Sequence, residues 1–191
     1  MGVKVERFPI PGPAMLTPKR HRDDRGYLAE TFQAARFDEA LGMAAVVQEN
    51  LVLSEHRYTL RGLHCQAPPQ AQAKLVAVLV GSVLDVAVDV RRGSPTYACS
   101  VTAELTATAG NMLYVPAGFL HGYLTLEANT LVLYKLDALY APASERAVRF
   151  DDPVLAVDWG VPAAECLVSD RDRAAGLFAE FDSPFVYAPP R

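Results

Sequence analysis

Short β-branched runs separated by turn residues fill the middle of the chain, and this pattern constrains the fold more than any other feature. Between residues 46 and 140, turn signals recur about every 8 to 12 residues. This spacing is typical of an all-β sandwich or small barrel, whereas βαβ units would place helical patterns between the strands. We therefore predict a mainly β fold, an antiparallel sandwich or jelly-roll barrel with a few short helices.

Two of these runs flank Gly81 and Ser82, a two-residue loop of the kind that joins the strands of a tight hairpin. Residues 75–80 and 83–90 are therefore expected to pair with each other. In the second run the apolar side chains alternate with others, so Leu84 and Val86 share one face and Asp85 lies on the other. The Asp85 carboxylate therefore points to the side of the sheet that this second face occupies.

The two ends of the chain differ from this β core. Four prolines within the first 20 residues remove backbone donors, which predicts an extended arm or edge strand. Short helices are predicted over residues 36–42, where Gly42 ends the helix, and over residues 171–178. We expect one domain, with an N-terminal arm and short helix at 1–45, the β core at 46–140 and a C-terminal appendage at 141–191.

Composition excludes several functions. The 18 Lys and Arg against 22 Asp and Glu give a net charge of −4, which argues against a nucleic-acid binder. No apolar run reaches the ~20 residues of a membrane span and no signal-peptide pattern is present, so a cytoplasmic protein away from membranes is predicted. The 3 cysteines are widely spaced without a C-x-x-C pair, which indicates reduced thiols.

Lysine and histidine are scarce, so their positions are informative. Lys74 precedes the most hydrophobic run, where an ammonium group is costly to bury without an acidic or anionic partner. It is either functional or a strand-end lysine whose charge reaches solvent. His64, in a polar segment, and His121, after a proline-glycine turn, each fit a structural or a functional role.

Several motifs occur in a fixed order and together form a known pattern. They are Asp24-Arg25-Gly26, Arg61-Gly62-Leu63-His64-x-Gln66, Gln72-Ala73-Lys74-Leu75-Val76, Gly93-Ser94-Pro95-Thr96, Val115-Pro116-x-Gly118-Phe119-x-His121-Gly122, Tyr134-Lys135, Tyr140-x-Pro142-x-x-Glu145 and Ser169-Asp170-Arg171-Asp172. This set resembles the dTDP-4-dehydrorhamnose 3,5-epimerase family, cupin-fold enzymes of deoxysugar biosynthesis. The resemblance covers nearly the whole chain.

The resemblance implies a cofactor-free isomerase that inverts C3 and C5 of dTDP-4-keto-6-deoxyglucose through an enolate, giving dTDP-4-keto-L-rhamnose. The C4 ketone acidifies the protons on both neighbouring carbons, so the reaction needs only proton transfers. By resemblance His64 is the base, Tyr134 is the acid and Lys74 stabilises the enolate oxygen. Asp172 would orient His64, and Asp85 is a second candidate for that charge partner.

The resemblance also implies a set of substrate-binding residues. Guanidinium groups suit a diphosphate, and the ring of Tyr140 is expected to stack on the thymine. Arg171 stands where the family usually has lysine, which keeps the charge but changes the donor geometry. Tyr27 and Tyr123 stand where phenylalanine is expected in many members. The predicted substrate-binding residues are Arg25, Glu30, Gln48, Asn50, Arg61, His121, Tyr140, Glu145 and Arg171.

No metal is predicted, although many cupins hold a divalent ion with a His-x-His pair, a following Glu and a distant His. Here the corresponding stretch reads His64-x-Gln66, followed by Lys74, whose ammonium repels a cation. This set of side chains argues against a metal-dependent cupin oxygenase or isomerase.

Other functions stay open beside the double epimerase. A mono-epimerase acting at C3 or C5 alone, or a relative that shifts the ketone between C3 and C4, would share these motifs. A non-catalytic nucleotide-sugar binding module is disfavoured because both His64 and Tyr134 are present. The resemblance implies a homodimer in which an N-terminal strand crosses to the neighbour's sheet, and the proline-bearing arm is consistent with such an exchange.

Overall fold

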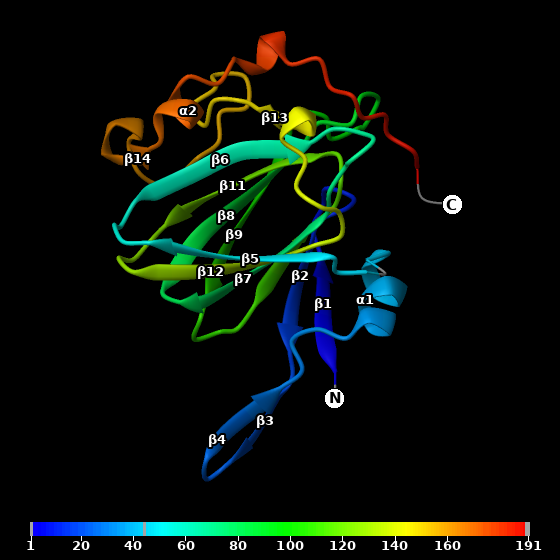
Figure 1. Ribbon diagram of the computed structural model, residues 1–191, viewed down its shortest axis with the longest axis vertical. Coiled ribbons are helices and arrows are strands. Elements are labelled where there is room, and N and C mark those ends of the chain that lie inside the picture. The colour runs from blue at the N-terminus through cyan, green and yellow to red at the C-terminus, as the bar shows by residue number, and fades with distance from the viewer. Residues whose placement is uncertain (1, 44, 190–191) are drawn as a thin grey trace.

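Two sheets packed face to face form the body of the protein, whose computed structural model describes residues 2–43 and 45–189 (Figure 1). The first sheet has the order β1-β2-β10-β7-β12-β5 and the second β13-β6-β11-β8-β9, with β14 beside β6. The strands of the first sheet are β1 (Val3–Arg7), β2 (Ala14–Pro18), β10 (Met112–Val115), β7 (Lys74–Val80), β12 (Thr130–Leu136) and β5 (Gln48–Ser54). The strands of the second are β13 (Glu145–Ala147), β6 (Thr59–Gln66), β11 (Phe119–Thr125), β8 (Ser82–Asp89), β9 (Ser100–Thr106) and β14 (Leu167–Val168). The predicted mainly β sandwich is confirmed.

The predicted edge strand near the N-terminus is also confirmed. β1 is the outermost strand of the first sheet and pairs antiparallel with β2 of the same chain. Beyond β2, the strands β3 (Arg20–Asp23) and β4 (Gly26–Ala29) form a separate hairpin. This β3–β4 hairpin projects away from the two sheets (Figure 1).

The helices are short. The predicted first helix is α1 (Ala34–Leu41), which is closed by Gly42 in the left-handed region at φ +72°. The predicted second helix is shorter than expected, because α2 (Asp170–Arg173) ends and a 3-10 turn, η3 (Phe178–Glu180), follows. The turn is held by the buried Asp152, whose carboxylate accepts from the Phe178 amide at 2.7 Å. Two further 3-10 turns are η1 (Pro142–Ser144) and η2 (Ala163–Glu165).

The described residues include no helix long and apolar enough to cross a membrane.

The predicted hairpin across Gly81 is wrong. β7 lies between β10 and β12 in the first sheet, whereas β8 lies between β11 and β9 in the second. Gly81 is therefore the corner where the chain crosses from one sheet to the other. Its φ is +79°, and a Cβ there would lie 2.5 Å from Thr130 Oγ1, so the corner itself requires glycine.

Apolar side chains fill both faces of the second sheet. Between the sheets, Val76 and Val132 of the first sheet pack with Ala87 of the second. On the outer face of the second sheet, Val86 packs against Trp159, in the C-terminal segment that lies over this sheet (Figure 1). As the alternation predicts, Val86 and Asp85 point to opposite faces, and Asp85 faces the space between the sheets.

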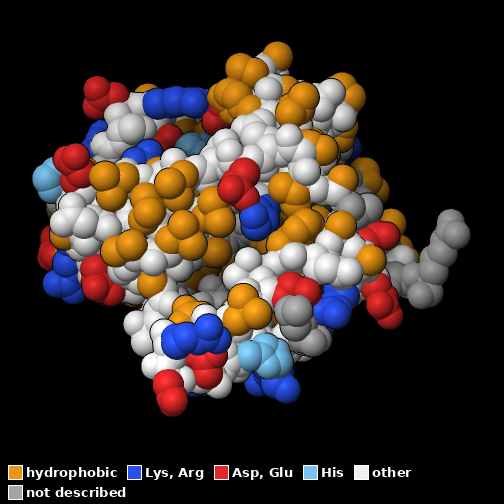
Figure 2. Space-filling model, turned by 60° about the horizontal axis from the view of Figure 1, so that its bottom comes forward, with side chains coloured by type: hydrophobic (Ala, Val, Ile, Leu, Met, Phe, Trp, Pro, Cys, Tyr) orange, Lys and Arg blue, Asp and Glu red, His pale blue; other side chains and the backbone are white. Residues whose placement is uncertain are grey.

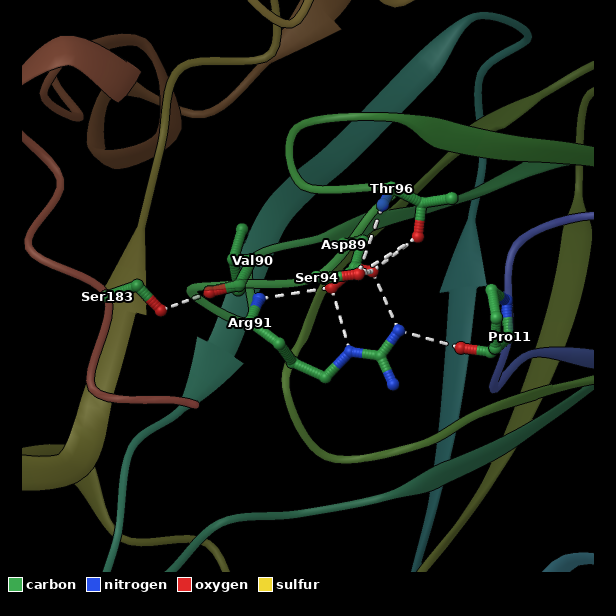
Figure 3. A network of polar contacts seen from close by, with 7 residues as sticks. All are labelled: Pro11, Asp89, Val90, Arg91, Ser94, Thr96 and Ser183. Atoms are coloured by element: carbon green, nitrogen blue, oxygen red, sulfur yellow. Dashed lines mark hydrogen bonds and ion pairs between the residues drawn. The ribbon is translucent and has the colours of Figure 1, made fainter. Parts of the chain in front are cut away.

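A buried ionic network closes the turn after β8 (Figure 3). Asp89, with no exposed surface, accepts hydrogen bonds from Ser94 Oγ at 2.6 Å, Thr96 Oγ1 at 2.7 Å and Arg91 Nη2 at 2.7 Å. Arg91 Nη2 also donates to the Pro11 carbonyl at 2.7 Å. The network therefore ties the loop between β8 and β9 to the N-terminal arm.

Candidate active site

A cavity of about 490 Å³ lies between the two sheets and is also lined by residues of the C-terminal segment. Its walls come from β5, β7 and β12 of the first sheet, from β6 and β11 of the second, and from α2. Ten of the thirteen predicted site residues line it: His64, Tyr134, Asp172, Lys74, Asn50, Arg61, His121, Tyr140, Glu145 and Arg171.

His64 and Asp172 form a hydrogen-bonded dyad at this cavity. His64 Nε2 lies 2.8 Å from Asp172 Oδ1, and the Gly62 amide donates to Asp172 Oδ2 at 3.3 Å. Burial would raise the pKa of Asp172, but the hydrogen bonds from His64 and Gly62 lower it overall. An ionised carboxylate only accepts hydrogen bonds, so His64 Nε2 carries the hydrogen. The Nδ1 lone pair is then the site on His64 that can take up a proton.

Asp172 reaches His64 because α2 begins just before it. Ser169 caps this short helix by accepting from the Asp172 amide at 3.1 Å, and the side chain of Asp172 is buried at the cavity. The chain places β6 and α2 side by side although the two dyad residues are 108 positions apart.

A second histidine and aspartate pair lies deeper in the sandwich. His121 Nε2 is 2.8 Å from Asp85 Oδ1, and both side chains are almost completely buried. Burial lowers the pKa of His121, and the Asp85 carboxylate acts in the opposite direction. Asp85 as a second candidate partner of His64 is therefore wrong, because β8 lies beside β11 and not beside β6.

Lys74 lines the cavity from the first position of β7. Its Nζ is 3.5 Å from the His64 carbonyl oxygen. Burial lowers the pKa of Lys74, while Cys65, Asp85 and Glu145 act in the opposite direction. Of the two interpretations of Lys74, the structure favours a side chain held inside the site over one that reaches solvent.

Tyr134, from β12, faces these groups from the first sheet. Its ring meets that of His121 edge to face at a centroid distance of 5.8 Å. Burial raises the pKa of Tyr134 well above its usual range, so the side chain carries its proton at neutral pH. A phenol on one wall and an imidazole on the other therefore face a common space.

Charged and aromatic groups form the rim of the cavity. Glu145 Oε2 accepts from Arg171 Nη2 at 2.6 Å and from the Tyr140 hydroxyl at 2.6 Å. Gln48 is not on the cavity wall, but its Oε1 accepts from the Tyr140 amide at 2.8 Å. Gln48 thus positions the backbone that carries the exposed ring of Tyr140.

Two predicted binding residues lie away from the cavity. Arg25 is on the projecting β3–β4 hairpin, where it pairs with Asp23 and is 90% exposed. Glu30 lies between that hairpin and α1 and pairs with Arg36. Within a single chain, neither reaches the cavity.

Some lining residues were not predicted, including Cys65, Gln66 and Gln72. Gln66 Oε1 accepts from the Ala141 amide at 2.7 Å, and Gln72 Nε2 donates to the Ala138 carbonyl at 2.6 Å, so both hold the loop after β12. Gln66 and Gln72 both stand in the ordered motifs of the sequence, which was the available signal. Burial raises the pKa of Cys65 to about 11, which keeps that thiol protonated.

In residues 2–43 and 45–189, no three His, Cys, Asp or Glu side chains are arranged to hold a metal ion. The two histidines of the cavity instead make their contacts with Asp172 and Asp85.

Comparison with known proteins decides the family. A sequence model of the family described as dTDP-4-dehydrorhamnose 3,5-epimerase matches residues 7–180. The dTDP-4-dehydrorhamnose 3,5-epimerase of Pseudomonas aeruginosa is 41% identical over 181 residues, which cover 94% of this chain and 98% of that protein. The chain belongs to the dTDP-4-dehydrorhamnose 3,5-epimerase family. The predicted isomerase class and activity are confirmed with it.

Solved structures of epimerases share the fold over the same length. The dTDP-6-deoxy-D-glucose-3,5-epimerase of Legionella pneumophila, in complex with dTDP-4-keto-L-rhamnose, matches with a TM-score of 0.92 at 37% identity. The match covers 98% of this chain and 100% of that one. A 3′-monoepimerase from Streptomyces bikiniensis, in complex with dTDP-quinovose, matches with a TM-score of 0.82 at 36% identity over 90% of this chain and 86% of that one. The predicted cupin-type sandwich is therefore that of the epimerase family.

Proposed function

We propose that this epimerase acts on dTDP-4-keto-6-deoxyglucose and inverts both C3 and C5, with His64 as the base and Tyr134 as the acid. One observation carries the proposal. The dyad of His64 and the ionised Asp172 lies on one wall of the cavity, and the protonated Tyr134 lies on the other. Inversion requires a proton to leave one face of a carbon and another to arrive on the opposite face, which two such groups can perform.

Each inversion has two proton transfers. Nδ1 of His64 takes the proton from the carbon, and the electron pair of the broken C–H bond moves onto the C4 oxygen as an enolate. Tyr134 then gives its hydroxyl proton to the opposite face of the same carbon, and the ketone is restored. The resulting imidazolium and phenolate return to their starting states by exchanging protons with solvent, so no net proton is consumed.

Lys74 and Asp172 stabilise the charges that appear in these steps. The partly buried Lys74 ammonium gains an anionic partner when the C4 oxygen becomes an enolate. Asp172 holds the His64 ring in the required tautomer and stabilises the imidazolium.

The rim is proposed to bind the nucleotide. Arg61 and Arg171 offer guanidinium groups for the diphosphate, and the half-exposed ring of Tyr140 offers a surface for the thymine. Asn50 and His121 are proposed to contact the sugar. The Legionella relative was solved with a dTDP-4-keto sugar, which supports a ligand of this class.

A homodimer is proposed because parts of the chain are unused within one copy. The β3–β4 hairpin carries Arg25 away from the cavity of its own chain. The outer face of the first sheet exposes Leu51, Leu53, Leu79 and Val80. Figure 2 shows hydrophobic side chains gathered beside the projecting hairpin. Since β1 pairs within its own chain, we propose that the β3–β4 hairpin is the segment that reaches the second copy, where it supplies Arg25 and Glu30.

The cytoplasmic location of the protein also stays a prediction.

Inversion at C3 or C5 alone is the second candidate. It is favoured by the match to the 3′-monoepimerase from Streptomyces bikiniensis, which is 36% identical to this chain. The residues that line the cavity are compatible with inversion at one carbon and with inversion at both.

Proton NMR of dTDP-4-keto-6-deoxyglucose with the enzyme in deuterated water, without added metal or nicotinamide, tests the proposal. Deuterium entering C3 and C5 with inversion at both supports a double epimerase, and entry at one carbon identifies a mono-epimerase. Absence of exchange at either carbon would contradict the proposed substrate and mechanism. His64→Ala should abolish exchange at both carbons, and Tyr134→Phe should exchange deuterium but invert poorly.

A further inference from the structure

Two buried polar atoms lie without hydrogen-bond partners in the part of the chain that the structure describes. They are the Tyr123 hydroxyl and Asp85 Oδ2. The two residues are direct register partners on β11 and β8, and neither has any exposed surface. Folded proteins rarely leave such groups unpaired, because each loses its hydrogen bonds to water on folding. An unpaired buried hydroxyl beside a reaction site therefore calls for a functional reason.

Tyr123 lies next to the proposed acid. The ring centroids of Tyr123 and Tyr134 are 6.3 Å apart at an interplanar angle of 45°. Burial raises the pKa of Tyr123 and the Asp85 carboxylate raises it further, while Ser54, Arg61 and Tyr134 act in the opposite direction. Ser54 Oγ itself faces Arg61 Nε at 3.4 Å.

We propose that Tyr123 is a positioning residue for Tyr134: its hydroxyl donates a hydrogen bond to the Tyr134 oxygen when Tyr134 gives up its proton. The inference rests on the proposed role of Tyr134 as acid. A phenolate only accepts hydrogen bonds, so the state that follows proton transfer presents a new acceptor to a donor that is unpaired beforehand. An interaction made only as charge develops lowers the barrier without tightening substrate binding.

Tyr123→Phe separates this role from a structural one. Removing an unpaired buried hydroxyl should raise the melting temperature by about 2–10 °C. The kcat for inversion should fall about 10- to 100-fold, the effect of one hydrogen bond to a charged group. KM should stay unchanged, since Tyr123 is not on the cavity wall. Exchange of deuterium into the carbons, which depends on His64, should continue, so the ratio of exchange to inversion rises.

Tyr114→Phe is the matched control. Tyr114 is a second buried tyrosine, on β10, and it does not line the cavity. Its variant should keep the ratio of exchange to inversion of the unmodified enzyme. Tyr123→Phe with that same ratio and an unchanged kcat would overturn the inference and leave the hydroxyl merely unpaired.

Failure of the proposed function would look different. If Tyr134→Phe inverts both carbons at the normal rate, the acid is misassigned, and the role of Tyr123 falls with it. If Tyr134→Phe is defective while Tyr123→Phe is normal, only the role of Tyr123 is rejected.

Discussion

Burial and pairing divide the side chains of the cavity into distinct charge states. Asp172 is ionised because His64 and Gly62 donate to it, whereas Tyr134 keeps its proton because burial raises its pKa. The same burial lowers the pKa of His121, although Asp85 contacts it. Two chemically similar pairs that both reach the cavity therefore differ in environment: His64 is partly exposed, whereas His121 and Asp85 are almost completely buried.

Asp172→Asn should lower kcat by about 10²–10⁴-fold at both carbons, because the amide no longer fixes the tautomer of His64 or stabilises its imidazolium. Initial rates of deuterium exchange measure the effect. Asp170→Asn, an exposed neighbour on the same short helix, is the control and should behave normally. Exchange within twofold of the unmodified enzyme in Asp172→Asn would remove Asp172 from the mechanism.

Lys74→Met should separate catalysis from stability. Removing a partly buried ammonium relieves a desolvation cost, so the melting temperature should be unchanged or higher. Loss of enolate stabilisation should slow exchange at both carbons by about 10²–10³-fold. Thermal denaturation and exchange rates are measured on the same preparation. An unstable variant with normal exchange per folded molecule would show that Lys74 serves the fold.

At the scale of elements, a close contact between β6 and β11 sets the position of both histidines. His64 and His121 are register partners, and the register shifts directly after His121. A Cβ on Gly62 would lie 2.5 Å from the Gly122 Cα, and one on Gly122 would lie 2.8 Å from the Arg61 carbonyl oxygen. The two strands approach this closely only because glycine occupies both positions.

Gly122→Ala should therefore destabilise the fold by about 1–3 kcal/mol, the usual effect of forcing a methyl group into a packed site. Urea denaturation gives the free energy of unfolding. Gly176→Ala is the matched control, because a Cβ there would meet only Glu180 Oε2 at 3.5 Å. Equal stability of the two variants would mean that β6 and β11 can separate without cost.

The network around Asp89 predicts a pH dependence. Burial would raise the pKa of Asp89, but Arg91, Ser94 and Thr96 lower it overall, below the ordinary value of 3.8. Its contribution to stability is thus fully present above the unfolded-state pKa and is lost as the pH falls through the lower folded-state pKa. At pH 7 the free energy of unfolding of Asp89→Asn should be lower than that of the unmodified protein by about 1–3 kcal/mol. This difference between the two proteins should become smaller below pH 3.8. Denaturation between pH 7 and pH 3 measures it, with Asp182→Asn, at an exposed aspartate, as control. A difference that stays constant over this range would reject the assignment.

The sequence predicted elements better than it predicted which elements lie side by side. The caps and period of α1 are local, and α1 formed as expected, whereas the loop at Gly81 looks the same whether the strands pair or cross between sheets. Asp85 was placed on the correct face by alternation, yet its partner depended on strand order, which alternation does not report. The 108 residues between His64 and Asp172 put their contact beyond any spacing rule, and only the ordered motifs indicated it.

At the scale of the whole molecule, the apolar outer face of the first sheet and the β3–β4 hairpin predict assembly. Leu53→Glu places a charge on that face, where Leu53 is 51% exposed, and should convert the proposed dimer to a monomer. Sedimentation at micromolar concentration measures the state. Val154→Glu, at an apolar residue that is 58% exposed on the C-terminal segment, is the control and should remain dimeric. An unmodified protein that sediments as a monomer would reject the dimer, and Arg25 would then have no route to the cavity.

The position of Asp172 on the C-terminal segment also sets the order in which the site is completed during synthesis. Ribosomes release a chain from its N-terminus, so His64, Lys74 and Tyr134 emerge before α2 and the turn at Phe178 that follows it. A nascent chain can build both sheets while the His64 ring still lacks its carboxylate. The enzyme therefore acquires an oriented base only after α2, which follows His64 by more than a hundred residues, has been made and has docked.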